Sequence, residues 1–220
     1  MGNFVIAYWE LRGFAEPARM LLEFGGIEYE NRLVNDGKKW FAEKFSLGMD
    51  FPNLPYIIDG DVKFTESWAI YRYLGKKFNL FPTSETDQRQ ADMLQGVIND
   101  IRVGFVRYIY HADLYKKIDD LRKNQSGKVD LMEKYLKDKK FLMGNDLTFL
   151  DFALFETFDH HRLFFTDIFD KSPNIQNYMK RFESLQPIAN YLSSARYKKF
   201  PINGPSASWG GQKENDRKYM

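Results

Sequence analysis

The stretch from Phe51 to Arg72, FPNLPYIIDGDVKFTESWAIYR, decides the fold because it combines a proline, a hairpin and a helix start. Asn53-Leu54-Pro55 precedes a short apolar strand, and Asp59-Gly60 is a typical hairpin turn. Val62 to Phe64 forms the return strand, and Glu66-Ser67 opens the next helix. The stretch therefore predicts a hairpin that leads directly into a helix.

The proline gives this hairpin a second property. Pro55 cannot donate a backbone hydrogen bond, and the bond before it can be cis at modest cost. A cis bond would leave the N–H and C=O of Leu54 facing outward, beside a helix N-terminus whose amides attract carboxylates. We therefore expect a site for a short extended peptide that carries an acid group.

The segments before the hairpin complete a recognisable unit. Phe4 to Tyr8 is predicted to be a strand, and Glu16-Pro17 opens a helix that ends at Gly25-Gly26. A second strand is expected over Ile27 to Val34, followed by a short helix around Lys39 to Phe45. With a proline before the third strand, this order predicts an α/β domain of the thioredoxin type over residues 1–82.

The chain contains no cysteine. A redox enzyme of the thioredoxin type needs a Cys-x-x-Cys pair, so that function is excluded, and disulfides are excluded with it. Any thiol chemistry here must therefore come from a ligand.

Composition and charge give no reason to expect nucleic acid or a membrane as partner. The 220 residues are 44% hydrophobic and 17% aromatic, enough for a sizeable core, and 32 basic against 30 acidic residues leave a net charge of +2. No apolar run reaches membrane-spanning length and no signal core follows the N-terminus, so we expect a soluble cytoplasmic protein.

From Leu80 onward the pattern changes from short elements to long helical ones, which predicts an all-helical domain over residues 83–220. Thr148 to Asp151 resembles a capping box at the start of a Phe- and Leu-rich helix, which we expect to be central and buried. The polar end, Gln212 to Met220, is expected to be a loose tail. Helices are predicted over Asp87 to Ala112 (with Gly96 and Gly104 as interruptions), over Lys116 to Lys137, and from Thr148, Ser172-Pro173 and Pro187 onward.

Taken together, these residues resemble the cytosolic glutathione S-transferases, nearest the mu class, over essentially the whole chain up to the tail. A Tyr-Trp or Glu-Ser pair alone would be common, but the combination is specific. The markers are Tyr8 to Gly13 (YWELRG), Lys44 to Tyr56 (KFSLGMDFPNLPY), the Glu66-Ser67 pair and the capping box Thr148 to Asp151.

Two departures from the mu pattern stand out. Only Asn35 to Lys39 precedes Trp40, where vertebrate mu enzymes have a longer loop, so the chain looks closer to the shorter helminth-type members. Glu66 stands where the mu pattern usually has glutamine. The first departure would open the rim of the site, and the second would change a ligand contact.

The resemblance implies that Tyr8 is the catalytic residue, at the end of the first strand and just before a helix. A free thiol has a pKa near 8.5, and lowering it by about two units takes about 2.7 kcal/mol of preferential thiolate stabilisation. A charge-assisted hydrogen bond from a neutral hydroxyl, helped by a helix N-terminus, supplies an effect of that order. The alternative is an ordinary aromatic residue at a strand end.

The same resemblance assigns a glutathione site. Ser67 is expected to hold the γ-glutamyl carboxylate and Glu66 to face the ammonium, while the Leu54 backbone pairs with the cysteinyl unit. Lys44 could instead be a solvated charge, and Asp100, implied to reach across a dimer, could be a solvated carboxylate or an ion pair. The expected glutathione contacts are Trp9, Trp40, Lys44, Asn53, Leu54, Glu66, Ser67 and Asp100.

A homodimer is also implied. Phe51 matches the family residue that inserts into an apolar pocket of the partner subunit, and Arg72 matches an arginine that stacks at the two-fold axis. Either residue could instead be a core aromatic or a surface cation.

The electrophile is expected above the thiolate, in an aromatic and apolar pocket that favours planar hydrophobic molecules. Tyr110 matches a hydroxyl that can bond to certain electrophiles, although it could equally be a packing residue. The expected pocket residues are Trp9, Leu11, Phe14, Val106, Tyr110 and Trp209.

No metal site or cofactor is expected. His160 and His161 are adjacent in a helix and point in different directions, and no phosphate-binding motif is present. Glutathione is therefore expected as a substrate of a transferase that forms thioethers with small hydrophobic electrophiles. The alternatives are a ligand carrier or structural protein on the same fold, and a glutathione-dependent prostaglandin isomerase.

Overall fold

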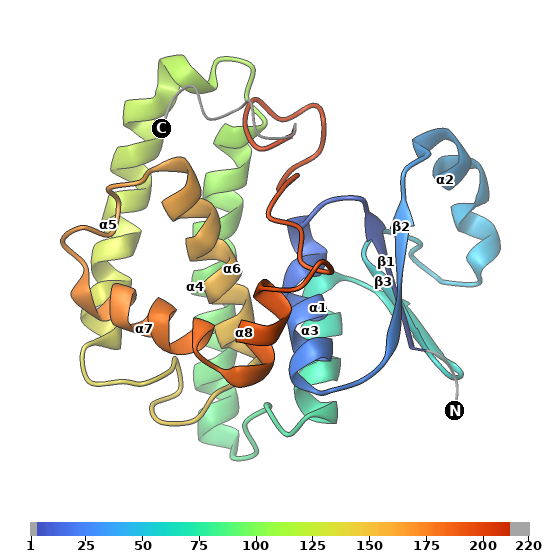
Figure 1. Ribbon diagram of the computed structural model, residues 1–220, viewed down its shortest axis with the longest axis horizontal. Helices are drawn as coiled ribbons and strands as arrows, with labels where there is room; N and C mark the ends of the chain where they lie inside the picture. The colour runs from blue at the N-terminus through green and yellow to red at the C-terminus, as the bar shows by residue number, and fades with distance from the viewer. Residues whose placement is uncertain (1–3, 212–220) are drawn as a thin grey trace.

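The computed structural model describes residues 4–211, and its N-terminal part is built on a mixed four-stranded sheet (Figure 1). The strand order is β2-β1-β3-β4, with β1 parallel to β2 and antiparallel to β3, and β3 antiparallel to β4. This arrangement confirms the thioredoxin-like fold. The strands are β1 Phe4–Trp9, β2 Tyr29–Val34, β3 Tyr56–Asp59 and β4 Val62–Thr65.

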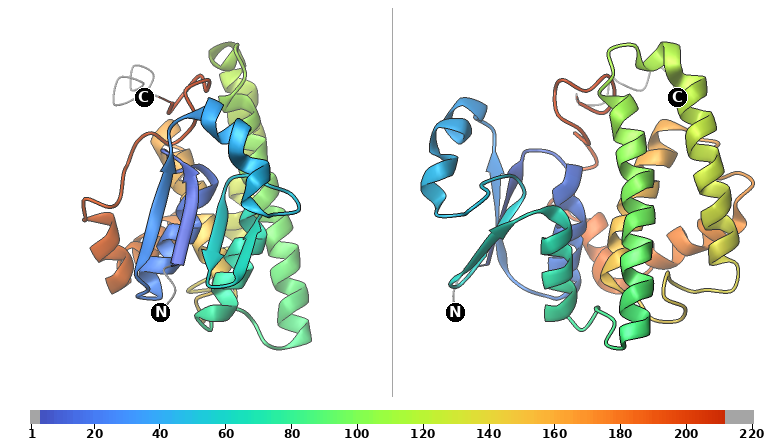
Figure 2. Two further views of the ribbon diagram at one scale, coloured as in Figure 1. Left: turned by 90° about the vertical axis from the view of Figure 1, so that its right-hand side faces the viewer. Right: turned by 180° about the vertical axis from the view of Figure 1, so that it is seen from behind.

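Two helices of the N-terminal part, α1 (Glu16–Phe24) and α3 (Ser67–Lys77), lie between the sheet and the helical part, whereas α2 (Gly37–Glu43) lies on the far side (Figures 1 and 2). Helix α2 starts two residues before the predicted position because the Asp36 carboxylate accepts the Lys39 N–H at 3.0 Å. Two 3₁₀ turns, η1 (Gly13–Ala15) and η2 (Lys44–Leu47), accompany these helices.

The helical part confirms the predicted all-α architecture. Helix α4 starts after Ser84, whose hydroxyl caps it, and passes Gly96 and Gly104 without a break, so the predicted interruptions were wrong. At Gly104 an added Cβ would lie 2.8 Å from the Lys128 ammonium, so the small residue lets α5 approach. The elements are α4 Glu85–Ile109, η3 Leu114–Lys117, α5 Ile118–Leu136, α6 Phe149–Phe164, α7 Pro173–Glu183 and α8 Gln186–Leu192.

Helix α6 is the buried centre of the helical part, as predicted. Asp151 in its first turn is fully buried and accepts the N–H and hydroxyl of Thr148, at 2.8 and 3.0 Å. The same carboxylate accepts the Leu142 N–H at 2.9 Å. The helix start is thereby tied to the loop before it.

The main core is continuous between the two parts, because α1 and α3 pack against α6. After α8 the chain returns as a strap, residues 200–211, that runs up between the two parts and ends in a loop beside the upper end of α4 (Figure 1). The N–H groups of Arg12 and Gly13 donate to the carbonyls of Pro201 and Ile202, both at 3.0 Å. The tail predicted over 212–220 lies outside the described residues.

Candidate functional site

A cavity of about 610 Å³ lies where the β1–α1 loop, α4 and the strap meet. Most of its walls are apolar or aromatic, and both parts of the chain contribute. Among its lining residues are Tyr8, Trp9, Leu11 and Phe14 from the first segment and Arg102, Val106 and Tyr110 from α4.

Tyr8 occupies the predicted place at the end of β1, and its side chain is buried. Its oxygen accepts the Phe14 N–H at 3.2 Å, which leaves the hydroxyl proton available as a donor. Burial raises the pKa of Tyr8, although the Phe14 N–H and the Arg102 charge oppose the shift. Tyr8 is therefore a neutral hydroxyl at physiological pH and can donate to an anion in the cavity.

Gly13 makes room for this hydroxyl. An added Cβ at this position would lie 2.7 Å from the Tyr8 oxygen and 2.6 Å from Leu11 Cδ1, and its φ of +43° disfavours other residues. The position of the hydroxyl therefore depends on a residue five positions along the chain.

The predicted peptide edge is present. The Leu54–Pro55 bond is cis, and the Leu54 backbone makes no hydrogen bond to the described residues. The hydroxyl of Thr65, at the end of β4, lies 2.8 Å from the Pro55 carbonyl and 3.2 Å from that of Asn53. Sequence reasoning missed Thr65, although the hairpin register places it opposite Tyr56 and hence beside the proline.

Next to this edge, Ser67 is the first residue of the eleven-residue helix α3. Glu66 precedes it with φ +77°, an uncommon backbone conformation for a residue other than glycine. Its side chain is exposed to solvent. The helix N-terminus and the Leu54 edge thus form neighbouring backbone sites for an acid and a peptide.

The aromatic contacts beyond this edge only partly match the prediction. The Trp9 and Trp40 rings lie 6.4 Å apart, and Trp40 stacks on Tyr56 at 6.1 Å. The Lys44 ammonium, however, lies over the exposed rings of Phe41 and Phe45, at 5.5 and 4.9 Å. The shared helical face of Trp40 and Lys44 therefore does not bring their side chains together here.

The residues predicted to act at or across a dimer interface, Phe51, Asp100 and Arg72, lie outside the cavity. Phe51 is 80% exposed, and Asp100 is exposed on α4 at the edge of an apolar groove of about 280 Å³ between α4 and α5. Met93, Val97, Leu131 and Met132 line this groove. Arg72 forms an ion pair with Asp92 and donates to Gln95 at 2.8 Å, so it already has partners within the chain.

Tyr110 lines the cavity and accepts the Gly204 N–H from the strap at 2.7 Å, which leaves its own proton free to donate. Trp209, in contrast, does not line the cavity, which corrects the prediction. It is 2% exposed and packs edge-on against Phe105 and Phe164, at 6.3 and 5.1 Å. The strap directs the Trp209 side chain into a second apolar cluster of the helical part, where burial removes the large ring from water.

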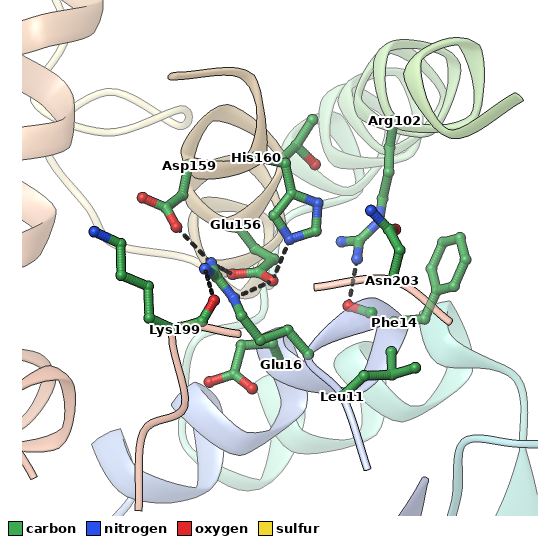
Figure 3. A network of polar contacts seen from close by, with 12 residues as sticks. Leu11, Phe14, Glu16, Arg102, Glu156, Asp159, His160, Lys199 and Asn203 are labelled. Carbon is green, nitrogen blue, oxygen red and sulfur yellow. Dashed lines mark hydrogen bonds and ion pairs between the residues drawn. The ribbon is translucent and has the colours of Figure 1, made fainter. Parts of the chain in front are cut away.

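Behind the cavity lies a buried charge network that sequence reasoning also missed (Figure 3). Arg12 donates to Glu156 at 2.6 Å and to Asp159 at 2.5 Å, and His160 Nε2 lies 2.7 Å from Glu156. Although burial opposes it, Arg12 and His160 hold the pKa of Glu156 well below its usual range. The network ties the β1–α1 loop to α6 and so fixes one wall of the cavity.

Within residues 4–211 no helix is both long and apolar enough to cross a membrane. Over the same residues, no group of three or more His, Asp or Glu side chains is placed to hold a metal ion.

The thioredoxin-like sheet, the cis proline and the helical part define a two-part protein with an unpaired backbone edge beside an apolar cavity. Comparison with known families agrees with this class. A model described as "Glutathione S-transferase, N-terminal domain" matches residues 4–76, and one described as "Glutathione S-transferase, C-terminal domain" matches residues 99–195. The chain belongs to the glutathione S-transferase family.

Individual relatives cover nearly the whole chain. Glutathione S-transferase 2 of Gallus gallus is 36% identical over 216 residues, which cover 95% of this chain and 98% of the relative. Glutathione S-transferase Mu 1 of Bos taurus is 35% identical over 215 residues, covering 94% and 99%. The crystal structure of the glutathione S-transferase Blo t 8 superimposes with a TM-score of 0.88 at 36% identity, covering 94% and 99%. The mu-class resemblance is confirmed, whereas a closer relation to helminth-type members stays a prediction.

Proposed function

We propose that this chain transfers glutathione to small hydrophobic electrophiles, with Tyr8 stabilising the thiolate. The observation that carries the proposal is the Tyr8 hydroxyl, buried at the cavity wall with its oxygen already accepting the Phe14 N–H. Its proton is thereby left to donate to the sulfur of a bound thiol.

The backbone near Tyr8 supports the same ligand. The free Leu54 edge can pair with the cysteinyl unit of glutathione, and the amides at the start of α3 can hold its γ-glutamyl carboxylate. Trp9 and Trp40 lie together beyond this edge and could contact the glycine end. Lys44 would join them only after its side chain leaves Phe41 and Phe45.

In the proposed reaction, the thiolate sulfur attacks an electrophilic carbon and a thioether forms, while the leaving group departs with its electron pair. Leu11, Phe14 and Val106 provide an apolar surface for the electrophile, and the Tyr110 proton can bond to its polar groups. Glutathione conjugation to a chlorodinitrobenzene tests the proposal. A purified protein without glutathione-dependent product formation would refute it and leave ligand carriage as the function.

We further propose that the chain works as a homodimer. Phe51 is an exposed aromatic side chain, and the groove between α4 and α5 is an exposed apolar surface that fits such a ring. Asp100 at the edge of this groove would then lie next to the partner's peptide site, where it could face the glutathione ammonium.

Glu66→Gln is expected to weaken glutathione binding by about 0.5 to 1.5 kcal/mol, with little change in the chemical step. Glu66 is exposed at the start of α3, where its carboxylate can attract the ligand ammonium while Ser67 and the helix amides hold the ligand carboxylate away. The difference should shrink with added salt. Calorimetry measures it, with Glu28→Gln, another exposed glutamate, as control. Tighter binding by the Glu66 variant at low salt would place Glu66 against the ligand carboxylate instead.

Gly13→Ala is expected to lower kcat/KM by about tenfold or more, because the added methyl displaces the Tyr8 hydroxyl. Gly26→Ala is the matched control. Gly26 also has a positive φ, of +65°, but an added Cβ there meets nothing within 4 Å. Both variants should lose thermal stability from backbone strain, and only the first should lose activity. Equal activity losses would argue against a steric effect on Tyr8.

A further inference from the structure

Among the residues that the structure describes, a buried cation lines the cavity without an acidic side chain as its partner. Arg102 of α4 is 4% exposed and lines the cavity. Its Nη2 donates to the Gly13 carbonyl at 2.5 Å, whereas Nε and Nη1 have no hydrogen-bond partner in the described part of the chain. An unpaired buried charge is costly, so this guanidinium points to an anionic ligand.

The nearby carboxylates are committed elsewhere. Glu156 and Asp159 bind Arg12, and Figure 3 shows Arg102 on the opposite side of His160 from Asp159. Glu10 at the cavity wall is 46% exposed and pairs with Lys198 at 3.1 Å. Between residues 4 and 211, no acidic side chain forms an ion pair with Arg102.

The titratable groups that face Arg102 are neutral at physiological pH. They come from three elements: Tyr8 of β1, Tyr71 of α3 and His160 of α6. Burial raises the pKa of both tyrosines, and burial lowers the pKa of His160 against the attraction of Glu156. The charge of Arg102 therefore acts on the cavity without a neighbouring anion to cancel it.

Phe14 keeps water away from this charge. The ring lies 4.5 Å from the guanidinium carbon and also lines the cavity. The Arg102 charge would act on an electrophile in the cavity across the Phe14 ring. After a rotation of Phe14, the electrophile could also contact the free N–H groups of Arg102 directly. Because Arg102 itself is buried, its charge is poorly screened and acts on the cavity without direct contact.

We propose that Arg102 makes the cavity selective for electrophiles that carry a carboxylate, or that gather negative charge on oxygen as they react, such as enones and nitroarenes. The proposal rests on the proposed transferase function. Arg102 would then be a specificity-determining residue, placed on the electrophile rather than on the glutathione sulfur.

The electron flow explains the selectivity. In an enone, the thiolate sulfur bonds to the β-carbon, the C=C π pair shifts to join the α-carbon to the carbonyl carbon, and the C=O π pair moves onto the oxygen to give an enolate. Water then protonates the α-carbon and leaves as hydroxide. In a halonitroarene, the pair moves onto the nitro oxygens and returns as the halide leaves. In a benzyl halide, the pair leaves directly with the halide, so no oxyanion forms for Arg102 to stabilise.

The test compares kcat/KM for an enone and for a benzyl halide of similar size. Arg102→Met removes the charge, and we expect the enone-to-halide ratio to fall about tenfold or more. Arg102→Lys keeps the charge and should retain most of the ratio. The Arg102 charge also reaches Tyr8, so thiolate absorbance should be followed in parallel; a rise in the pKa of bound glutathione lowers both rates alike and cancels in the ratio. An unchanged ratio, or equal losses for both substrates with a raised thiol pKa, would overturn the proposal.

A measurement on the unaltered protein keeps the test decisive if Arg102→Met does not fold. S-(carboxybenzyl)glutathione should bind about tenfold more tightly than its carboxamide in calorimetry, since the carboxylate meets the unpaired cation. Equal or tighter binding of the carboxamide would overturn the role of Arg102. Failure of the transferase function itself looks different, because the unaltered protein would then conjugate neither electrophile, and both proposals would fall.

Discussion

Tyr8→Phe is expected to raise the pKa of the bound glutathione thiol and to lower turnover about thirtyfold or more when chemistry is limiting, a loss of about 2 to 3 kcal/mol. The substitution keeps the ring in its buried place at the end of β1 and removes only the hydroxyl. The loss of a donor that favours the thiolate raises the thiol pKa, so less thiolate is present at neutral pH.

Because Tyr8→Phe should raise the pKa of the bound thiol, the loss of activity should depend on pH. The unaltered protein should reach its maximal rate at a pH well below the ordinary thiol value, whereas the rate of the variant should keep rising as pH approaches about 8.5. The defect should therefore shrink with increasing pH. Thiolate absorbance of the bound ligand and pH–rate profiles measure the two quantities independently.

Tyr56→Phe is the matched control for this substitution. Tyr56 is also a buried tyrosine, on the adjacent strand β3, and its hydroxyl bonds to Arg32 at 3.3 Å. Its loss should leave the thiol titration unchanged. An unchanged titration and rate in the Tyr8 variant would remove Tyr8 from the mechanism.

Phe51→Ala is expected to shift the protein toward monomer at micromolar concentration, since it would empty an apolar pocket at a cost of about 3 to 5 kcal/mol. The single chain should stay folded, because Phe51 is 80% exposed and contributes little to the core. Activity should fall with dissociation, since Asp100 of each chain would no longer reach the other site. Sedimentation over a concentration series measures the equilibrium.

Two further variants locate the contact. Phe45→Ala removes a neighbouring aromatic that is 73% exposed, and it should leave the dimer intact. Leu131→Asp places a charge in the α4–α5 groove, and it should weaken association as Phe51→Ala does. If the Phe51 variant sediments as an undisturbed dimer, Phe51 is not the anchor of the interface.

Local chemistry explains why much of the fold was predictable. The Asp59-Gly60 turn, the helix start at Pro17 and the Thr148–Asp151 contact each depend on residues within a few positions of one another. Such features can be predicted from the sequence because the backbone groups of turns and helix caps form hydrogen bonds with neighbouring residues. The helix interruption predicted at Gly104 was wrong because packing against α5 outweighs the lower helix propensity of glycine. The helix also passes Gly96, where an added Cβ would meet nothing within 4 Å.

The residues of the candidate site also fall into two groups, those predictable from neighbouring residues and those placed by distant parts of the chain. The places of Tyr8, Leu54 and Ser67 in the fold were predictable because they sit beside a strand end, a proline and a helix start, all visible in the sequence, while their roles stay predictions. Arg102 was missed because its environment comes from Gly13 and Phe14, about ninety positions away along the chain. Trp209 was misplaced because the path of the strap decides which apolar cluster receives it.

The sequence by itself determined the thioredoxin-like unit, the helical part, the peptide edge at Pro55 and the absence of any thiol in the protein. These features follow from short-range patterns and composition. Only the tertiary structure decided which charges are paired and which are not. Arg12 and Arg102 are both buried arginines, yet one meets two carboxylates of α6 and the other meets none. The energy of a buried charge depends on the groups that folding brings around it, and those groups come from distant parts of the chain.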